Sequence, residues 1–258
     1  MEYRILKTGF FLADGGAMFG SIPKRAWKLR YSFDEENRCC LAMNCLLVWN
    51  ENRIVLLDTG VGTKELGKLS CYKFRDRKDI HKMVHSCGFE PEQITDVVLS
   101  HLHFDHCGGC TYWDKNGNLR IAFPNATHWV SEKQWQNYLH PNALEKDVFR
   151  PEDVLPIFNA GLLRRIDSDV ELFENFYMKL FDGHTQSQIV SFIKRKNQYG
   201  LLFPGDVIPT KAHLSDEWIS AYDVEPLQSL TAKIALKEWI KQENIKTIFY
   251  HDSYHFSS

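Results

Sequence analysis

The segment Ser-His-Leu-His-Phe-Asp-His at residues 100–106 constrains the fold of this chain more than any other part of the sequence. It places side chains of the metal-ligand type at His101, His103, Asp105 and His106. In an extended segment, side chains two residues apart point the same way, so His101 and His103 can converge on one cation. Asp105 and His106, past a bend, can face a second cation. The spacing therefore predicts a two-metal site, and the alternative is a histidine-rich surface loop without a metal.

The predicted ligands are imidazoles and carboxylates, with no thiolate. This set suits zinc first, and iron, manganese or cobalt can also bind to it. The chain does contain seven cysteines, but their odd number and irregular spacing predict reduced thiols rather than a disulfide framework. Cys107 and Cys110 directly follow the metal segment. We interpret them as small packing groups around the loop, with a thiol near the metals as the alternative.

The pattern H-x-H-x-D-H followed by Gly108 and Gly109 resembles the signature loop of the metallo-β-lactamase-fold hydrolases. Further segments resemble that family's other landmarks in the same order along the chain, at residues 55–60, 182–185, 203–206 and 249–252. The resemblance implies that Asp58 supports the metal loop from behind. It also implies a metal-ligand set of His101, His103, Asp105, His106, His184, Asp206 and His251, in which Asp206 bridges the two metals.

These ligands lie far apart in the sequence, so only a fold can bring them together. A chain of 258 residues is long enough for a large core, and we expect residues 1–258 to form a single hydrolase domain. Strand patterns at 46–49, 54–57, 94–99, 189–193, 199–203 and 245–250 alternate with a helical pattern from Pro226 to Trp239. Asn197 and Gln198 are expected in a turn. The pattern indicates an α/β fold, and the resemblance implies a four-layer αββα sandwich of two mixed β-sheets flanked by helices.

Two divalent cations that share Asp206 and a solvent oxygen would lower the pKa of that water toward about 7, which makes a metal-bridging hydroxide available as the nucleophile. Asp105 is expected to orient the attacking oxygen while it binds metal. The resemblance is closest to the quorum-quenching lactonases and their organophosphate-hydrolysing relatives. The predicted function is therefore metal-dependent hydrolysis of a small lactone, ester or phosphoester.

One position departs from the acyl-homoserine lactonases, which carry a tyrosine for the leaving group three residues after the bridging aspartate. This chain has Pro209 there. His213 and Tyr222 are the candidates to replace that tyrosine as proton donor, and the other interpretation of each is a packing or surface residue. Phe11 and Met18 are interpreted as core packing rather than as a substrate wall.

Two alternatives to the lactonase-like hydrolase are a glyoxalase II-like thioesterase and a non-catalytic, metal-stabilised binding protein. The basic cluster that a glutathione thioester would need is not identifiable in the sequence. A nuclease of the same fold is disfavoured by the formal charge of −2, from 31 basic and 33 acidic residues. The same balance argues against a nucleic-acid or anionic-membrane partner, so a small-molecule substrate is expected.

The first residues lack the charged-then-apolar pattern of a signal peptide, and no apolar run approaches the ~20 residues that span a bilayer. A cytoplasmic location is therefore expected. His255, near the chain end, is interpreted as a surface residue. The resemblance also implies a homodimer.

Overall fold

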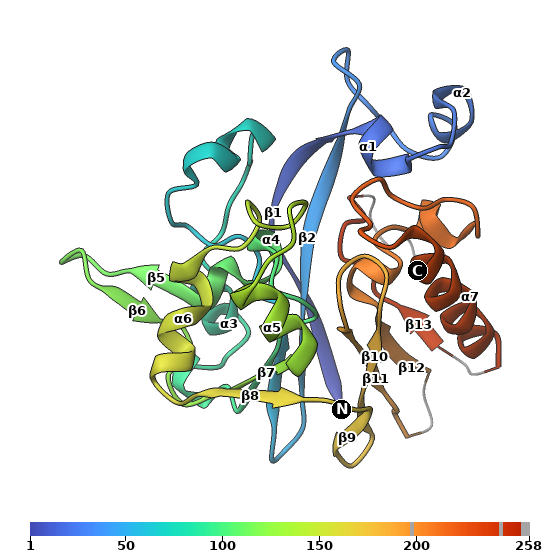
Figure 1. The fold of residues 1–258 in the computed structure, drawn as a ribbon. Helices are drawn as coiled ribbons and strands as arrows, with labels where there is room; N and C mark the ends of the chain where they lie inside the picture. The colour runs from blue at the N-terminus through green and yellow to red at the C-terminus, as the bar shows by residue number, and fades with distance from the viewer. Residues whose placement is uncertain (197–198, 243–244, 254–258) are drawn as a thin grey trace.

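The computed structural model describes residues 1–196, 199–242 and 245–253, and Figure 1 shows two mixed β-sheets that face each other. Helices cover the outer sides of the sheets: α3 (Ile80–Ser86), α5 (Glu132–Leu139) and α6 (Pro151–Asn159) beside the first, and α7 (Pro226–Gln242) beside the second. This confirms the predicted fold class. The predictions for Asn197, Gln198 and His255 concern positions outside the described residues.

The first sheet has the strand order β1-β2-β3-β4-β7-β8. Its strands are β1 (Glu2–Asp14), β2 (Arg38–Trp49), β3 (Ile54–Leu57), β4 (Asp96–Val98), β7 (Thr127–Ser131) and β8 (Leu163–Ile166). β1, β2 and β3 pair antiparallel, whereas β3, β4, β7 and β8 run parallel. The strands predicted at 46–49 and 54–57 form a hairpin, because β2 pairs with β3, and Asn50 begins its turn by accepting hydrogen bonds from the backbone of Asn52 and Arg53.

The second sheet has the order β13-β12-β11-β10-β9. Its strands are β9 (Val170–Phe173), β10 (Phe176–Phe181), β11 (Gln188–Ile193), β12 (Gly200–Phe203) and β13 (Ile245–Thr247). β13 pairs parallel to β12, and the other pairs are antiparallel. A separate hairpin joins β5 (Thr111–Trp113) to β6 (Leu119–Ile121).

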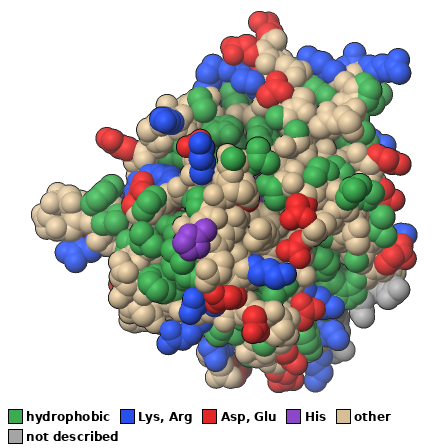
Figure 2. Space-filling model, in the orientation of Figure 1, with side chains coloured by type: hydrophobic (Ala, Val, Ile, Leu, Met, Phe, Trp, Pro, Cys, Tyr) green, Lys and Arg blue, Asp and Glu red, His purple; other side chains and the backbone are tan. Residues whose placement is uncertain are grey.

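The remaining helices are short. They are α1 (Gly15–Phe19), α2 (Lys24–Trp27), α4 (Phe104–Cys107) and the 3-10 helices η1 (Gly67–Tyr72), η2 (Pro91–Gln93), η3 (Gly108–Cys110), η4 (Gly205–Val207) and η5 (Lys211–Leu214). Within the described residues, no helix combines the length and the apolar character needed to cross a bilayer. Figure 2 shows acidic and basic side chains interspersed over one face, in line with the small net charge.

The second sheet separates two clusters of buried apolar side chains. Side chains alternate between the two faces of each strand, so one strand contributes to both clusters. In β11, Ile189 and Ile193 join the large cluster between the sheets, whereas Val190 and Phe192 pack against Leu236 of α7 on the outer face. β11 is therefore buried on both sides, which explains its nearly continuous apolar sequence.

The strand predicted at 245–250 is shorter than expected, since β13 ends at Thr247. The backbone of Ile248 still bonds to Leu202 of the second sheet, but the chain then crosses to the first sheet. There Asn44 donates to the carbonyl of Tyr250 at 3.0 Å and Ala42 donates to the carbonyl of His251 at 3.2 Å. This crossing fixes His251 between the two sheets.

Candidate metal centre

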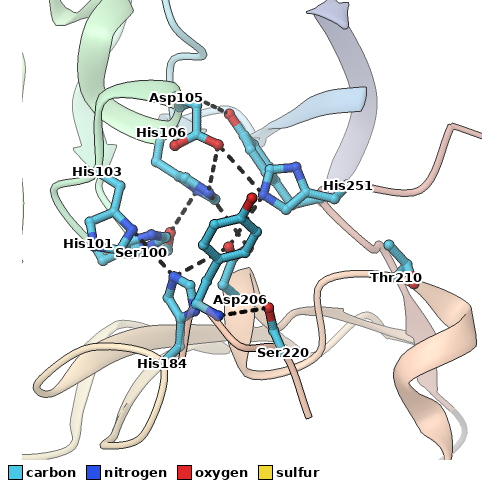
Figure 3. Close-up of polar contacts among 12 residues, drawn as sticks. Ser100, His101, His103, Asp105, His106, His184, Asp206, Thr210, Ser220 and His251 are labelled. Atoms are coloured by element: carbon cyan, nitrogen blue, oxygen red, sulfur yellow. Dashed lines mark hydrogen bonds and ion pairs between the residues drawn. The ribbon is translucent and has the colours of Figure 1, made fainter. Parts of the chain in front are cut away.

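The predicted metal ligands lie at the ends of strands from both sheets. The parallel strands β3 and β4 lead into Asp58 and the 99–106 segment, and β12 leads into Asp206. Because the carboxyl ends of parallel strands meet at one edge, a site assembles there from distant parts of the chain. The edge also receives His184, from the connection between β10 and β11, and His251. Figure 3 shows the predicted ligands pointing toward one another, namely His101, His103, Asp105, His106, His184, Asp206 and His251.

The ligand atoms form overlapping groups in which all atoms lie within 4.8 Å of one another. The groups are His101–His103–His184, Asp105–His106–His251 and His101–His106–Asp206. His101 and His103 thus share one group, as their two-residue spacing predicted. Asp105 and His106 share another, and His101 also shares the third group with His106 and Asp206. The arrangement provides one pocket of imidazoles and a second, mixed pocket of imidazole and carboxylate.

Asp206 lies between the two groups. One carboxylate oxygen, Oδ2, is 3.4 Å from Nε2 of His184 and 3.2 Å from Nε2 of His251. The other, Oδ1, is 3.5 Å from Nε2 of His106. Burial alone would raise the pKa of Asp206, but His251, His106 and His184 hold it well below the ordinary value, so the carboxylate is ionised. In this position the Asp206 carboxylate could contact a cation in each of the two groups.

Each site histidine uses its outer ring nitrogen in a hydrogen bond, which leaves the other nitrogen directed at the centre. The pairs are His101 Nδ1 with Ser100 Oγ at 3.0 Å, His106 Nδ1 with Asp58 Oδ2 at 2.8 Å, His184 Nδ1 with Asp223 Oδ1 at 2.9 Å, His251 Nδ1 with the Ala42 carbonyl at 2.9 Å, and His103 Nε2 with Glu145 Oε1 at 3.1 Å. The rings are therefore oriented by the protein itself.

Three of the inner atoms lack hydrogen-bond partners. Nε2 of His101, Nε2 of His106 and Oδ1 of Asp206 are buried and make no hydrogen bond. Buried polar atoms are normally satisfied, so three such atoms aimed at one point require an explanation. Divalent cations coordinated by imidazole nitrogen and carboxylate oxygen explain all three, and the residues present fit such a pair of ions.

Asp58 holds the metal segment from behind, as the resemblance implies. It is fully buried and adopts a left-handed backbone with φ of 56°, a strained conformation for a residue other than glycine. Its carboxylate accepts from the backbone and the hydroxyl of Ser100, each at 2.7 Å, and from His106. Gly109 allows the loop to approach this support, because a Cβ there would lie 2.2 Å from the carbonyl oxygen of Thr59.

A cavity of about 220 Å³ lies beside the ligands. Part of its lining is polar and comes from His103, Asp105, His184, Asp206 and His251. The rest is largely apolar and includes Phe11, Met18, Leu41, Phe104, Val148 and Val224. Phe11 and Met18 were expected in the core, and both are buried, but they also face the cavity. That expectation is corrected, since one side chain can complete the core and line the cavity.

His213 and Tyr222, the candidate proton donors, lie in different surroundings. His213 is absent from the cavity lining, and its ring stacks on Phe19 with centroids 5.0 Å apart. Nε2 donates to the carbonyl of Met18 at 2.9 Å, Nδ1 lies 2.7 Å from the hydroxyl of Thr210, and burial lowers the pKa to about 4. A neutral, fully bonded imidazole outside the cavity is not a general acid, so the expectation for His213 is corrected.

Tyr222 does line the cavity, beside the metal ligands and Tyr72. Its segment is fixed by backbone hydrogen bonds from Ala221 to Ala17 at 2.8 Å and from Val224 to His184 at 3.2 Å. Partial burial and the neighbouring Tyr72 raise the pKa of Tyr222, so its hydroxyl keeps its proton at neutral pH.

Cys107 and Cys110 are buried free thiols behind the loop. Cys107 contacts the carbonyl of Leu102 at 3.3 Å, and Cys110 contacts the hydroxyl of Thr59 at 3.5 Å. Burial raises the pKa of both thiols, and neither belongs to the ligand groups within the described residues. These contacts agree with the interpretation as packing groups.

Glu145 and Asp223, the carboxylates in hydrogen-bond contact with His103 and His184, were missed by the sequence analysis. Both lie in irregular connections, and neither stands at a recognisable spacing from the histidine that it contacts. No local signal in the sequence marks them.

The sequence profile of the Metallo-beta-lactamase superfamily matches residues 40–241. A curated relative, the N-acyl homoserine lactonase AiiA of Bacillus thuringiensis subsp. kurstaki, is 26% identical over 219 residues, which cover 81% of this chain and 80% of the relative. A crystal structure of a probable metal-dependent hydrolase from Staphylococcus aureus superposes with a TM-score of 0.91 at 27% identity, over 99% of this chain and 90% of that one. AidC, a dizinc quorum-quenching lactonase, has the same fold, with a TM-score of 0.76 at 23% identity over 96% and 86% of the two chains.

Proposed function

Since this chain belongs to the metallo-beta-lactamase superfamily and is a lactonase-like, metal-dependent hydrolase, we propose that it uses two zinc ions to hydrolyse a small, neutral lactone or ester. The observation that carries this proposal is the set of unpartnered inner atoms on His101, His106 and Asp206 beside a largely apolar cavity. Bound cations would supply Lewis-acid polarisation of the substrate oxygen and would lower the pKa of water toward about 7.

His101, His103 and His184 are proposed to hold one ion, and Asp105, His106 and His251 the other, with Asp206 between them. The outer hydrogen bonds place a ring proton on the outer nitrogen of each histidine, so the inner nitrogen is the one available to bind a metal. Asp105 also lines the cavity, where its carboxylate can accept a hydrogen bond from an attacking water. We further infer that residues 1–258 act as one domain, because these ligands come from both sheets.

Tyr222 is proposed to donate a proton to the leaving group. Its side chain lines the cavity, its hydroxyl makes no hydrogen bond within the described residues, and its raised pKa keeps the proton in place. An alkoxide is a poor leaving group in an apolar surrounding, so a donor at this position assists ring opening of a lactone. This role fills the position that Pro209 leaves without a hydroxyl.

The cavity lining favours a neutral substrate. In the part of the chain that the structure describes, no lysine or arginine lines the cavity. A glutathione thioester or a phosphomonoester would bring carboxylate or phosphate groups that meet no side-chain cation there. The apolar walls instead suit an acyl group of several carbons, so a lactone or ester ranks above a phosphoester and a thioester.

Metal content and substrate preference test the proposal together. Purified protein is expected to hold two zinc ions per chain by elemental analysis. It is also expected to turn over lactones and carboxylic esters faster than phosphotriesters, phosphomonoesters or glutathione thioesters in a matched panel. Protein that is folded and carries no metal after exposure to zinc would overturn the proposal. Two bound metals without turnover of any panel member would instead support the metal-stabilised binding protein.

Tyr222→Phe is expected to lower kcat on an alkyl lactone by about 100-fold, the lower end of the range for loss of a general acid. The same variant should hydrolyse a nitrophenyl ester at close to the normal rate, because that leaving group departs without a proton. Tyr72→Phe, on the same cavity wall, is the matched control. Equal losses on both substrates would assign Tyr222 a packing role instead.

The homodimer and the cytoplasmic location that the sequence implies stay predictions.

A further inference from the structure

Glu145 is a buried carboxylate that the chemistry proposed above does not use. It lies in the connection between α5 and α6, and its residue is only 3% exposed. Oε1 accepts hydrogen bonds from Nε2 of His103 at 3.1 Å and from the hydroxyl of Thr185. Oε2 accepts from the amide groups of Asn137 at 2.9 Å and of Asn142. Four donors converge on one side chain, so an ionised carboxylate is the group that satisfies them all.

The contact with Glu145 decides which nitrogen His103 presents to the centre. Nε2 is committed to Glu145, and Nδ1 faces inward, 3.2 Å from Nε2 of His184. His101, His106, His184 and His251 present Nε2 instead and use Nδ1 outside. A ring that binds through Nδ1 stays close to its own backbone, so the far nitrogen reaches the 140–149 segment.

The same segment forms a wall of the cavity. Leu144 and Val148, which flank Glu145, both line it, and Leu144 is 76% exposed. The carbonyl of Val148 accepts a hydrogen bond from the backbone of Phe104 at 3.0 Å. The segment is therefore attached to the metal loop at two adjacent residues, through the backbone at Phe104 and through the side chain of His103.

We propose that Glu145 is a positioning residue that holds His103 in its metal-binding orientation and ties this cavity wall to the three-histidine site. The inference rests on the proposed function, because it assumes that His101, His103 and His184 bind a metal. An orienting carboxylate of this kind changes metal affinity by about 10- to 100-fold in other sites. Its loss should therefore weaken one metal site selectively and loosen the wall formed by Leu144 and Val148.

The test is a Co²⁺ and Zn²⁺ titration of the wild type and of Glu145→Gln, with a competing chromophoric chelator. Visible absorption of Co²⁺ separates the sites, since ligand type and geometry set its bands. In Glu145→Gln, affinity at the three-histidine site is expected to fall by about 10- to 100-fold, and the second site should change by less than about threefold. Asp147→Asn, an exposed acid in the same segment, removes the same charge and is expected to titrate as the wild type.

The melting temperature of the metal-free proteins distinguishes a purely structural role of Glu145. If the role were only structural, Glu145→Gln would lower the melting temperature without a selective loss of metal affinity at one site. Should Glu145→Gln fail to fold, Asn137→Ala removes one donor to Glu145 and is expected to weaken the same site to a smaller extent. Unchanged affinities in Glu145→Gln, or equal weakening of both sites, would overturn the inference alone. A wild type that binds neither Co²⁺ nor Zn²⁺ would overturn the proposed function, and the inference with it.

Discussion

Asp206→Asn is expected to lower kcat/KM on the best panel substrate by about 1000-fold, because it removes about 4 kcal/mol of transition-state stabilisation. The carboxylate faces His106, His184 and His251, so its negative charge serves both ligand groups at once. Asparagine has nearly the same shape but offers one neutral oxygen. The variant should therefore fold normally and lose part of its metal content along with its activity.

Three measurements check this expectation: kcat/KM, metals per chain, and the melting temperature. Asp167→Asn replaces an exposed aspartate that belongs to no ligand group and does not line the cavity, and it should leave all three unchanged. Wild-type protein stripped with a chelator should reach the same low activity as Asp206→Asn, and added zinc should restore only the wild type. An Asp206→Asn protein that keeps two metals and stays within about tenfold of wild-type kcat/KM would contradict the bridging role.

The elements that deliver the ligands were predictable because their signals are local. β4 is a short strand with the β-branched pair Val97 and Val98 that leads into the metal segment, and β12 ends immediately before the turn that contains Asp206. Period-two alternation and β-branched residues identify such strands without knowledge of their partners. The side-chain convergence of His101 with His103 follows from the same local geometry.

The parts that were missed depend on contacts between distant segments. Glu145 reaches His103 across the connection that follows α5, and Asp223 reaches His184 from the loop before α7. The prediction of His213 as a proton donor was wrong because the ring stacks on Phe19, a contact that the sequence does not reveal. Spacing in the sequence carries no information about such pairs, because irregular loops have no period that fixes where a side chain points.

Beneath the metal loop, Lys64 is a fully buried lysine whose ammonium group supports the turn after His106. It donates to the carbonyl of Gly108, to the carbonyl of Thr111 at 2.7 Å and to the hydroxyl of Thr111 at 2.9 Å. Asp153 of α6 lies 3.0 Å away, and both side chains are inaccessible to solvent. Lys64 therefore joins the metal loop to α6 through a paired, desolvated charge.

Lys64→Ala is expected to lower the free energy of unfolding by about 3–5 kcal/mol, which is the usual cost of removing one partner from a buried ion pair. The substitution leaves the buried Asp153 carboxylate with only the more distant Arg150, whose Nε lies 3.9 Å away, and removes the Lys64 donor from two carbonyl oxygens. Urea denaturation of the metal-free protein measures this cost directly. Lys68→Ala, on the exposed η1 helix, should change the free energy of unfolding by no more than about 0.5 kcal/mol.

The double variant Lys64→Met with Asp153→Leu tests why Lys64 matters. If the cost of Lys64→Ala came only from the loss of the close ion pair with Asp153, an apolar pair of similar volume would restore most of the stability, as it does in other buried ion pairs. Here the carbonyls of Gly108 and Thr111 would still lack donors, at about 1–3 kcal/mol for each unsatisfied group. We therefore expect only partial recovery. Full recovery would mean that water molecules donate hydrogen bonds to the loop carbonyls in the double variant. Lys64 would then stabilise the fold through the ion pair alone.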